Sequence, residues 1–448
     1  MSGLAALRAG LGDIACSDEG AELEAKSRDY YWYSPILKAR LDDKRAGLIV
    51  RPRSEADVLR VAALCARHRV PLTPRGAGTG NYGQAVPLAG GVVLEMTAMN
   101  RIVSIEPNRA RVEAGVVILD LDRAARASGQ QVLMYPSTGS IATIGGFIAG
   151  GHSGIGSIRN GILRDPGNVS LIRVITLEDP PRVIELRDAD IQKVHHAYGT
   201  NGVITELVVA LQPAVEWVHC IARFSSYRDT CRFGIAAGGR AVAGALDLYL
   251  LSAVEGRIIG PYYKEFDAIL RHADAMFALV APASVAAFFT LAASFGGERA
   301  VAETAAGMAA RDLPPVIECA YNHTTLMALK RDRSVTYLQV AFPAPLDADL
   351  VQHFIDHFGE EVQMHHEFSK MDGRLVAFAL PLVQYFDEAR IREIIHDFED
   401  RGCHVFDPHT YVLEDGGMKV VDAAQIDFKN LADPQGLMNP GKTRGWKP

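Results

Sequence analysis

Residues 74–83 read Pro74-Arg75-Gly76-Ala77-Gly78-Thr79-Gly80-Asn81-Tyr82-Gly83, with four glycines in eight residues. Glycine tolerates positive φ, so such a loop can turn sharply and present successive backbone N–H groups to an anion. The segment Gly78–Gly83 also matches GxGxxG, which in a Rossmann fold must open a helix. Pro87 and two further glycines follow within Gln84–Gly91 and exclude that helix. The loop therefore predicts a pyrophosphate site in another fold.

A second glycine-rich segment, Pro136–Gly156, lies downstream and interleaves its glycines with isoleucine and phenylalanine. A backbone of this kind can lie close against a flat ligand. The two loops are separated by a strand–helix–strand pattern, and together they are a far stronger signal than either alone. By contrast, Gly436–Thr443 matches GxxxxGK[ST] only literally, because the five residues after it cannot form the helix of a P-loop.

Working outward from the loops, the pattern predicts an α+β protein. Short Val/Ile/Leu runs alternate with glycine clusters up to Pro213, and Ser54–His68 has the cap residue and amphipathic spacing of a helix. Longer helical segments mixed with strands follow. We predict four parts: an N-terminal segment (1–44), a first domain (45–213), a second α+β domain (214–403), and a C-terminal segment that returns to the first domain (404–448).

The composition is that of a globular protein, with 48% hydrophobic and 22% charged residues. A net charge of −7 and the lack of a basic stripe argue against nucleic-acid binding. Six scattered cysteines without metal spacing indicate free thiols, and we predict a cytoplasmic protein. The uncharged stretch Ala275–Gly297 is interrupted by Pro282, which predicts a short cap helix and no transmembrane segment, although contact with a membrane surface stays open.

Three segments, Arg75-Gly-Ala-Gly-Thr, Thr143-Ile-Gly-Gly and Gly199-Thr-Asn-Gly-Val-Ile-Thr-Glu, together resemble the FAD domain of the vanillyl-alcohol oxidase/p-cresol methylhydroxylase (PCMH) family. The ending Asp433–Lys442 is similar to that of its glycolate-oxidase and D-lactate-dehydrogenase branch. The resemblance implies a PCMH-type FAD-binding domain with a cap, or substrate, domain. It covers about half of the chain and is loose over residues 216–402.

The resemblance also implies which residues bind FAD. Two loops would wrap the pyrophosphate, strand residues would pack near the adenine and ribose, and the tail would reach the flavin. These residues are Pro74, Arg75, Gly76, Ala77, Gly78, Thr79, Gly80, Pro136, Thr143, Gly145, Gly146, Gly150, Gly151, Val203, Ile204, Asn439 and Lys442. The family's covalent histidine would fall at Thr79 or Gly80, so non-covalent FAD is expected, with His152 as the alternative attachment point.

In the hydroxy-acid branch, a Glu-His-Gly segment upstream of the tail binds a divalent metal. Here Glu414-Asp415-Gly416 stands in that place, and the accompanying His-x6-His pattern is missing. We therefore predict no metal site. The same departure weakens the implication of a D-2-hydroxy acid substrate.

Flavin oxidation of an alcohol needs a base for the hydroxyl proton, and histidine titrates near neutrality. The sequence offers His323 or His409 as base, Tyr411 as orienting partner on the same predicted strand face as His409, and Glu414. At most one of the adjacent His365 and His366 is expected to face a ligand. The run Tyr30–Tyr33 could line the pocket or the seam between domains.

The sequence predicts an FAD-dependent oxidase or dehydrogenase that oxidises an alcohol or 2-hydroxy acid by hydride transfer to flavin N5. A phenolic-alcohol oxidase, a sugar-type oxidase and a non-catalytic flavin-binding subunit remain alternatives. We expect a small-molecule substrate, a quinone or carrier protein among the candidate electron acceptors, and a homo-oligomer.

Overall fold

The first glycine-rich loop begins where a small sheet ends. In the computed structural model, which describes residues 3–446, this sheet has the strand order β1-β2-β4-β3. The strands are β1 (Ala15–Ser17), β2 (Leu48–Arg51), β4 (Val92–Glu95) and β3 (Leu72–Arg75). The last three are parallel. Helix α4 (Glu55–His68) connects β2 to β3, and a capping box between Ser54 and Asp57 fixes its start. No helix follows the loop in residues 76–91, so the exclusion of a Rossmann site is confirmed.

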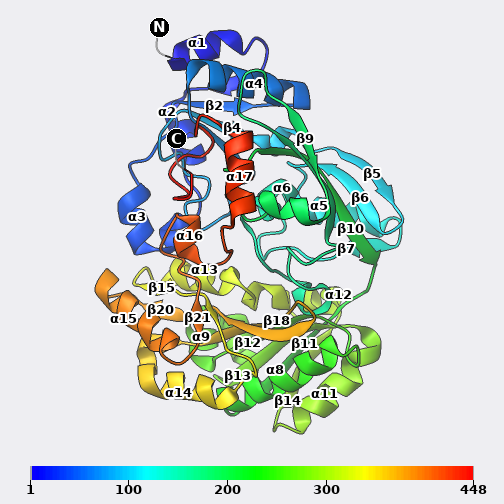
Figure 1. Cartoon of the computed structure of the whole chain (residues 1–448). Helices are drawn as coiled ribbons and strands as arrows, with labels where there is room; N and C mark the ends of the chain where they lie inside the picture. The colour runs from blue at the N-terminus through cyan, green and yellow to red at the C-terminus, as the bar shows by residue number, and fades with distance from the viewer. Residues whose placement is uncertain (1–2, 447–448) are drawn as a thin grey trace.

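An antiparallel sheet forms the rest of the first domain, with the order β5-β6-β10-β8-β9 and β7 beside β10. Its strands are β5 (Ile102–Glu106), β6 (Arg109–Glu113), β7 (Gln130–Val132), β8 (Val169–Ile175), β9 (Val183–Leu186) and β10 (Val203–Pro213). Helices α5 (Ile118–Arg126) and α6 (Ile144–Gly150) lie beside this sheet (Figure 1). Apolar side chains of both helices, such as Leu121 and Ile148, share one core with Leu207 of β10.

The second half of the chain is built on an eight-stranded antiparallel sheet, at the bottom of Figure 1. Its strands in spatial order are β14 (Glu298–Glu303), β11 (Val218–Phe224), β13 (Asp274–Val280), β12 (Leu248–Val254), β18 (His365–Met371), β19 (Arg374–Ala379), β16 (Val340–Ala341) and β21 (His404–Val405). A three-stranded sheet accompanies it, formed by β15 (Val335–Tyr337), β20 (Leu382–Gln384) and β17 (Val362–Gln363).

Two sets of helices form separate cores with this large sheet. One core includes side chains of α8 (Tyr227–Val242), α11 (Val285–Ala293), α14 (Ala348–Phe358) and α15 (Glu388–Glu399). The other includes α9 (Gly256–Tyr262), α10 (Lys264–Leu270) and α13 (Asn322–Arg331). Because neighbouring residues of a strand face opposite sides, the alternating side chains of β12 and β13 serve both cores. Helix α13 thereby lies on the side of the sheet that faces the first domain (Figure 1).

The stretch Ala275–Gly297 contains a strand and a short helix. Residues up to Val280 belong to the buried strand β13, and a 3-10 turn at Pro282–Ser284 leads into α11. The expectation of a short helix starting near Pro282 is therefore confirmed, and the apolar residues before it are explained by a central strand. Within residues 3–446, none of the helices combines the length and the apolar character that crossing a bilayer needs.

Both ends of the chain pack on the first domain. Helix α1 (Gly3–Gly10) buries Leu7 in the core around α4, and α17 (Ala423–Ala432) buries Phe428 in the core of the antiparallel sheet. The tail then runs beside β3, where the Leu72 N–H donates to the Leu437 carbonyl at 2.9 Å. Figure 1 shows the red C-terminal segment among the blue N-terminal elements. The predicted α+β class with two substantial domains is confirmed.

Candidate active site

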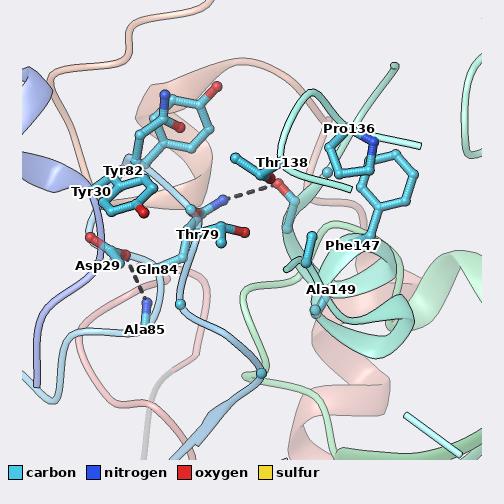
Figure 2. A pocket seen from close by; sticks show the side chains of 18 of the residues that line it. Asp29, Tyr30, Thr79, Tyr82, Gln84, Ala85, Pro136, Thr138, Phe147 and Ala149 are labelled. Atoms are coloured by element: carbon cyan, nitrogen blue, oxygen red, sulfur yellow. Dashed lines mark hydrogen bonds between the residues drawn. The ribbon is translucent and has the colours of Figure 1, made fainter. Parts of the chain in front are cut away.

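The main cavity lies between the two glycine-rich loops and the start of helix α13. Figure 2 shows Asp29, Tyr30, Thr79 and Gln84 on one wall, facing Pro136, Thr138, Phe147 and Ala149 on the other. The second half of the chain closes the cavity with side chains of Tyr321, Asn322, His323, Gln339, Phe378, Leu380, Phe406 and Met418. The site therefore draws residues from the N-terminal segment, both loops and the second domain.

Glycine is required where the loops approach one another. A Cβ on Gly76 would lie 2.1 Å from Thr143 Oγ1, and a Cβ on Gly80 would lie 1.9 Å from Gln84 Oε1. Gly78 has φ of 72°, a conformation that residues with a side chain rarely adopt. A larger residue at Gly76 or Gly80 would displace Thr143 or Gln84, so the glycines set the spacing of the two walls.

The loops also leave donors and acceptors without partners. In the described part of the chain, the backbone N–H groups of Ala77, Gly78, Thr79 and Gly80 make no hydrogen bond to another backbone group. Several polar side-chain atoms around the cavity are buried and likewise unpartnered; they are Arg75 Nε, Gln84 Oε1, Asn322 Oδ1, His323 Nδ1 and Gln339 Oε1. Buried polar groups normally have hydrogen-bond partners, so this wall is built for a polar ligand. Consecutive N–H groups fit a phosphate in particular.

Asp29 carries a carboxylate at the edge of the first loop. It accepts hydrogen bonds from the backbone N–H of Tyr31 at 2.9 Å and of Ala85 at 3.1 Å (Figure 2). Burial raises the pKa of Asp29, while these bonds and the nearby Lys442 oppose the shift. The carboxylate thus ties the N-terminal segment to the residues that follow the loop.

At the opposite wall, α13 begins at an unusual backbone conformation. Tyr321 has φ of 50° and ψ of −142°, and its hydroxyl donates to the Gly154 carbonyl in the second loop at 2.7 Å. Asn322 and His323 follow on the first turn and line the cavity. His323 Nδ1 lies 3.2 Å from Glu318 Oε2, and the imidazole is 14% exposed. A partly exposed histidine held by a carboxylate thus lies in the same cavity as the two loops.

A comparison with protein families identifies the part of the chain that holds these loops. Residues 46–178 match the family model described as an FAD binding domain. These residues form an FAD-binding domain. The free N–H groups and unpartnered polar atoms described above are consistent with that cofactor, and FAD is the cofactor that the sequence predicts.

Curated relatives are similar in sequence to this chain over a limited length. The chain is 33% identical over 176 residues to glycolate oxidase subunit GlcD of Bacillus subtilis (strain 168), which covers 38% of this chain and 37% of that protein. It is 32% identical over 184 residues to D-lactate dehydrogenase of Anaerostipes hadrus, again covering 38% and 37%. The matched part thus spans little more than a third of each of these relatives.

Solved structures share the fold of nearly the whole chain. An alkyldihydroxyacetonephosphate synthase superposes with a TM-score of 0.70 at 15% identity, covering 95% of this chain and 82% of that one. A BBE-like 1 variant from Physcomitrella patens gives 0.66 at 12% identity and covers 98% of both chains. Both halves of the present protein therefore share the fold of these two proteins.

Most residues predicted to bind FAD line the cavity. They are Pro74, Arg75, Gly76, Ala77, Gly78, Thr79, Gly80, Pro136, Thr143, Gly145, Gly146, Gly150, Gly151 and Ile204. Val203 does not line it: as the neighbour of Ile204 on β10, it points to the other face and packs in the core around α4. Of the two residues only Ile204 lines the cavity, and the contact of Val203 with FAD stays a prediction.

The two tail residues lie behind the first loop and outside the cavity lining. Asn439 donates from Nδ2 to the carbonyls of Gln84 at 2.8 Å and Tyr198 at 2.6 Å. Lys442 is fully buried and donates from Nζ to the Gly83 carbonyl at 2.5 Å. Both side chains contact the backbone beside the loop, and the contact of Lys442 with the flavin stays a prediction. Burial lowers the pKa of Lys442 to about 7, against the opposing effect of Asp29.

Three of the four predicted catalytic residues also lie outside the cavity lining. His409 and Tyr411 are not in a strand, since β21 ends at Val405. His409 is buried, and its Nδ1 lies 2.7 Å from the hydroxyl of Ser34, the residue that caps α3 (Pro35–Leu41). Burial lowers the pKa of His409, against the opposing effect of Asp407. His409 and Tyr411 thus lie outside the lining of this cavity, and a catalytic role for them stays a prediction.

Tyr411 and Glu414 instead hold the C-terminal tail. The ring of Tyr411 lies 5.1 Å from the ammonium of Lys442. Glu414, in the short helix α16 (Leu413–Gly416), accepts hydrogen bonds from the backbone N–H groups of Arg444 at 2.9 Å and Gly445 at 3.0 Å. These contacts use Oε1 alone, Oε2 is buried without a partner among the described residues, and a catalytic role for Glu414 stays a prediction. His323 is the predicted catalytic residue that lies in the cavity.

Of the other candidate histidines, some line the cavity and some do not. His365 and His366 are both buried in β18 and point to opposite faces, and neither lines the cavity. His152 does line it, with its ring 5.5 Å from that of Phe378, and burial lowers its pKa to about 3. Across residues 3–446, no group of three or more His, Cys, Asp and Glu side chains is arranged to hold a metal ion.

Sequence reasoning missed the tyrosines that surround the cavity. Tyr82 and Tyr198 line it beside the first loop, and Tyr321 lines it from the second half. Of the aromatic run Tyr30–Tyr33, Tyr30 and Tyr33 line the cavity, so the pocket alternative holds for these two. Their spacing resembles ordinary core positions, and only Tyr82, directly inside the glycine loop, carried a local signal.

Proposed function

We propose that the protein is an FAD-dependent oxidoreductase that oxidises a CH–OH group, with His323 as the base. The observation that carries this proposal is the position of His323 on the wall opposite the two loops of the FAD-binding domain. Bound FAD would supply the hydride acceptor at N5. The relatives named glycolate oxidase subunit and D-lactate dehydrogenase support an activity of this type.

The arrangement of His323 suits proton abstraction. With the proton of the imidazole on Nδ1, facing the Glu318 carboxylate at 3.2 Å, Nε2 keeps a lone pair that can accept a hydroxyl proton. The nearby imidazole of His323 lowers the pKa of Glu318, so this carboxylate stays ionised and would stabilise the imidazolium that forms. The adjacent Asn322 Oδ1, buried without a partner, can accept a hydrogen bond from the substrate and help to orient it.

The cavity wall favours an uncharged alcohol over a 2-hydroxy acid. Among the described residues that line the cavity, Arg75 is the sole arginine or lysine. Its guanidinium already donates to the carbonyls of Arg28 at 2.6 Å and Ala77 at 3.3 Å, beside the loop that we assign to the pyrophosphate. Tyrosine and phenylalanine rings fill much of the remaining wall. The hydroxy acid stays the second candidate substrate, because the relatives' names point to it.

We further propose that FAD is bound without a covalent link. The first loop offers Thr79 and Gly80 where a histidine would be needed. His152 lies in the second loop, where its ring packs beside Phe378 and Phe406. The six cysteines are all free thiols, which fits the cytoplasmic location that we propose. A quinone or carrier protein as electron acceptor, and a homo-oligomeric state, remain our working hypotheses.

The visible spectrum of the purified protein tests the proposal first. We expect a flavin spectrum whose chromophore is released by acid precipitation. Anaerobic addition of alcohols and of 2-hydroxy acids with the same side chain, such as benzyl alcohol and mandelate, should then bleach the band near 450 nm, as expected for flavin reduction. Bleaching by the acids alone would favour the second candidate. A flavoprotein that no member of the panel bleaches would favour a non-catalytic flavin-binding subunit, and a protein that takes up no FAD would refute the proposal.

A further inference from the structure

Glu367 lies in the interior of the second half, and one of its carboxylate oxygens is the meeting point of three donors. Oε1 accepts from the backbone N–H of Tyr321 at 2.7 Å and from the Ser252 hydroxyl at 2.9 Å. His365 Nε2 lies 2.8 Å from the same oxygen. All three side chains, Glu367, Ser252 and His365, have no exposed surface. We call these three residues the Glu367 cluster.

The cluster is a product of sheet geometry. His365 and Glu367 stand two residues apart on β18, so they share one face of the sheet. Ser252 is the direct cross-strand partner of Glu367 on β12. The face they share carries η5 (Val316–Cys319) and the start of α13, and Ser252 Oγ also lies 3.3 Å from the Cys319 carbonyl. The cluster therefore reaches the segment that leads into the cavity wall.

Full burial of a carboxyl group is unfavourable, because its hydration is lost and must be replaced by hydrogen bonds. Apolar residues pack well on a sheet face of this kind, so the three polar residues call for a separate explanation. The explanation lies in which atoms of the cluster have partners: Oε2 of Glu367 and Nδ1 of His365 are to be compared with the Tyr321 backbone. The first two atoms have no partner among the described residues, whereas Oε1 accepts the backbone N–H of Tyr321.

Tyr321 is the residue whose backbone needs to be held. Positive φ is disfavoured for a residue with a bulky side chain, and such strain persists where the surroundings enforce it. Its N–H is fixed by Glu367, and its hydroxyl is fixed by Gly154 in the second glycine-rich loop. The chain therefore turns at Tyr321 between two anchors, and Asn322 and His323 leave that turn as the first residues of α13.

We propose that the Glu367 cluster is a positioning device that holds Tyr321 in its strained conformation and so directs Asn322 and His323 into the cavity. The role assigned to His323 rests on the proposed function, whereas the holding of Tyr321 does not. Glu367, Ser252 and His365 do not line the cavity. They act through Tyr321, whose hydroxyl reaches across the seam between the two halves of the chain to Gly154.

Amide hydrogen exchange tests this proposal without any substrate. We expect Glu367→Ala to speed exchange of the Tyr321 amide at least tenfold, and Glu367→Gln, which keeps an acceptor oxygen, to restore most of the protection. Glu255→Ala is the matched control, because this buried carboxylate also accepts a backbone N–H, that of Met364 at 2.6 Å, away from the cavity. Unchanged exchange at Tyr321 in Glu367→Ala, or an equal rise in the control, would overturn the proposal.

The orientation of His323 has its own readout. The rate at which diethyl pyrocarbonate modifies His323, followed by mass spectrometry, should change at least threefold in Glu367→Ala and stay unchanged in Glu255→Ala. If Glu367→Ala does not fold, Glu367→Gln gives the same comparison with a smaller change. If Glu367→Ala speeds exchange of the Tyr321 amide but leaves the modification rate of His323 unchanged, the cluster stabilises the fold without positioning His323. A flavin that neither the alcohols nor the 2-hydroxy acids reduce would refute the proposed function and leave both measurements interpretable.

A double mutant isolates the strain itself. Glycine adopts the Tyr321 backbone conformation without penalty, so Tyr321→Gly removes the need for an anchor. We expect the loss in thermal unfolding midpoint caused by Glu367→Ala to fall to half or less in the Tyr321→Gly background. Equal losses in both backgrounds would mean that the cluster does not act on the Tyr321 backbone.

Discussion

Gln84 donates from Nε2 to the Gly150 carbonyl at 2.9 Å, and this hydrogen bond joins the two glycine-rich loops across the cavity (Figure 2). The amide fills the space that the missing side chains leave, since a Cβ on Gly80 or on Gly150 would collide with it. Its other end, Oε1, is buried without a protein partner. One side chain thus sets the separation of the loops and offers an acceptor to the cavity.

We predict that Gln84→Ala raises the dissociation constant of FAD about five- to tenfold, because one buried hydrogen bond contributes roughly 1 kcal/mol. FAD titration followed by flavin fluorescence measures the change. Gln384→Ala is the control, since this side chain also donates to a backbone carbonyl, that of Ser334 at 3.1 Å, but lies in the second half. Equal affinities of the wild type and Gln84→Ala would show that the loops hold their spacing without this bond.

Gly76→Ala should abolish FAD binding or weaken it by about a hundredfold, which corresponds to about 2.7 kcal/mol. The added methyl would lie 2.1 Å from Thr143 Oγ1, so one loop must move. Gly239→Ala provides the matched control: this glycine lies within α8, nothing stands within 4 Å of its Cβ position, and alanine there should raise stability by about 0.5–1 kcal/mol. Retention of the FAD spectrum in Gly76→Ala would contradict the close-packed arrangement.

The loops could be predicted from sequence because their conformation depends on local backbone freedom. Gly76, Gly78 and Gly80 are needed whatever the rest of the chain does, and their density is visible in the sequence. The α+β class followed from the same local patterns. The residues that complete the cavity, such as Gln339 and Met418, come from distant segments without any motif, and only the fold brings them to the loops.

The polar tail and the histidines show why the position of the remaining site residues could not be predicted from the sequence. Asn439 and Lys442 do serve the first loop, but they bind its carbonyls from behind, and the sequence carries no information on which side they approach. His409 was expected on a strand face beside Tyr411, yet that segment is irregular. His323 could be recognised as polar, whereas its contact with Glu318 and its place opposite the loops depend on tertiary packing.

His323→Gln should slow anaerobic flavin reduction by about a hundred- to ten-thousandfold, the usual contribution of a general base, while FAD affinity and the unfolding midpoint stay close to wild type. Stopped-flow absorbance near 450 nm measures the rate with the alcohol that bleaches the wild type. His409→Gln tests the assignment, since His409 contacts Ser34 outside the cavity lining and its loss should lower stability without a comparable effect on reduction. A larger loss of rate in His409→Gln than in His323→Gln would reverse the assignment.

Lys442 predicts a pH dependence of stability in the alkaline range. Burial lowers its pKa in the folded protein to about 7, whereas an exposed lysine in the unfolded chain titrates near its usual value of about 10.4. Between these values the unfolded chain binds the proton that the folded protein has lost, so the contribution of Lys442 to the unfolding free energy rises with pH, by at most about 1.4 kcal/mol per pH unit. The neighbouring Asp29, whose pKa is raised by burial from 3.8, acts with the opposite sign.

Urea denaturation at pH 7, 8, 9 and 10 should therefore show the wild type gaining stability relative to Lys442→Met. The stability of the exposed Lys330→Met variant should change with pH in parallel with that of the wild type. Parallel curves for the wild type and Lys442→Met would mean that Lys442 keeps its charge in the folded protein, where Asp29 and the Tyr411 ring would then have to stabilise it.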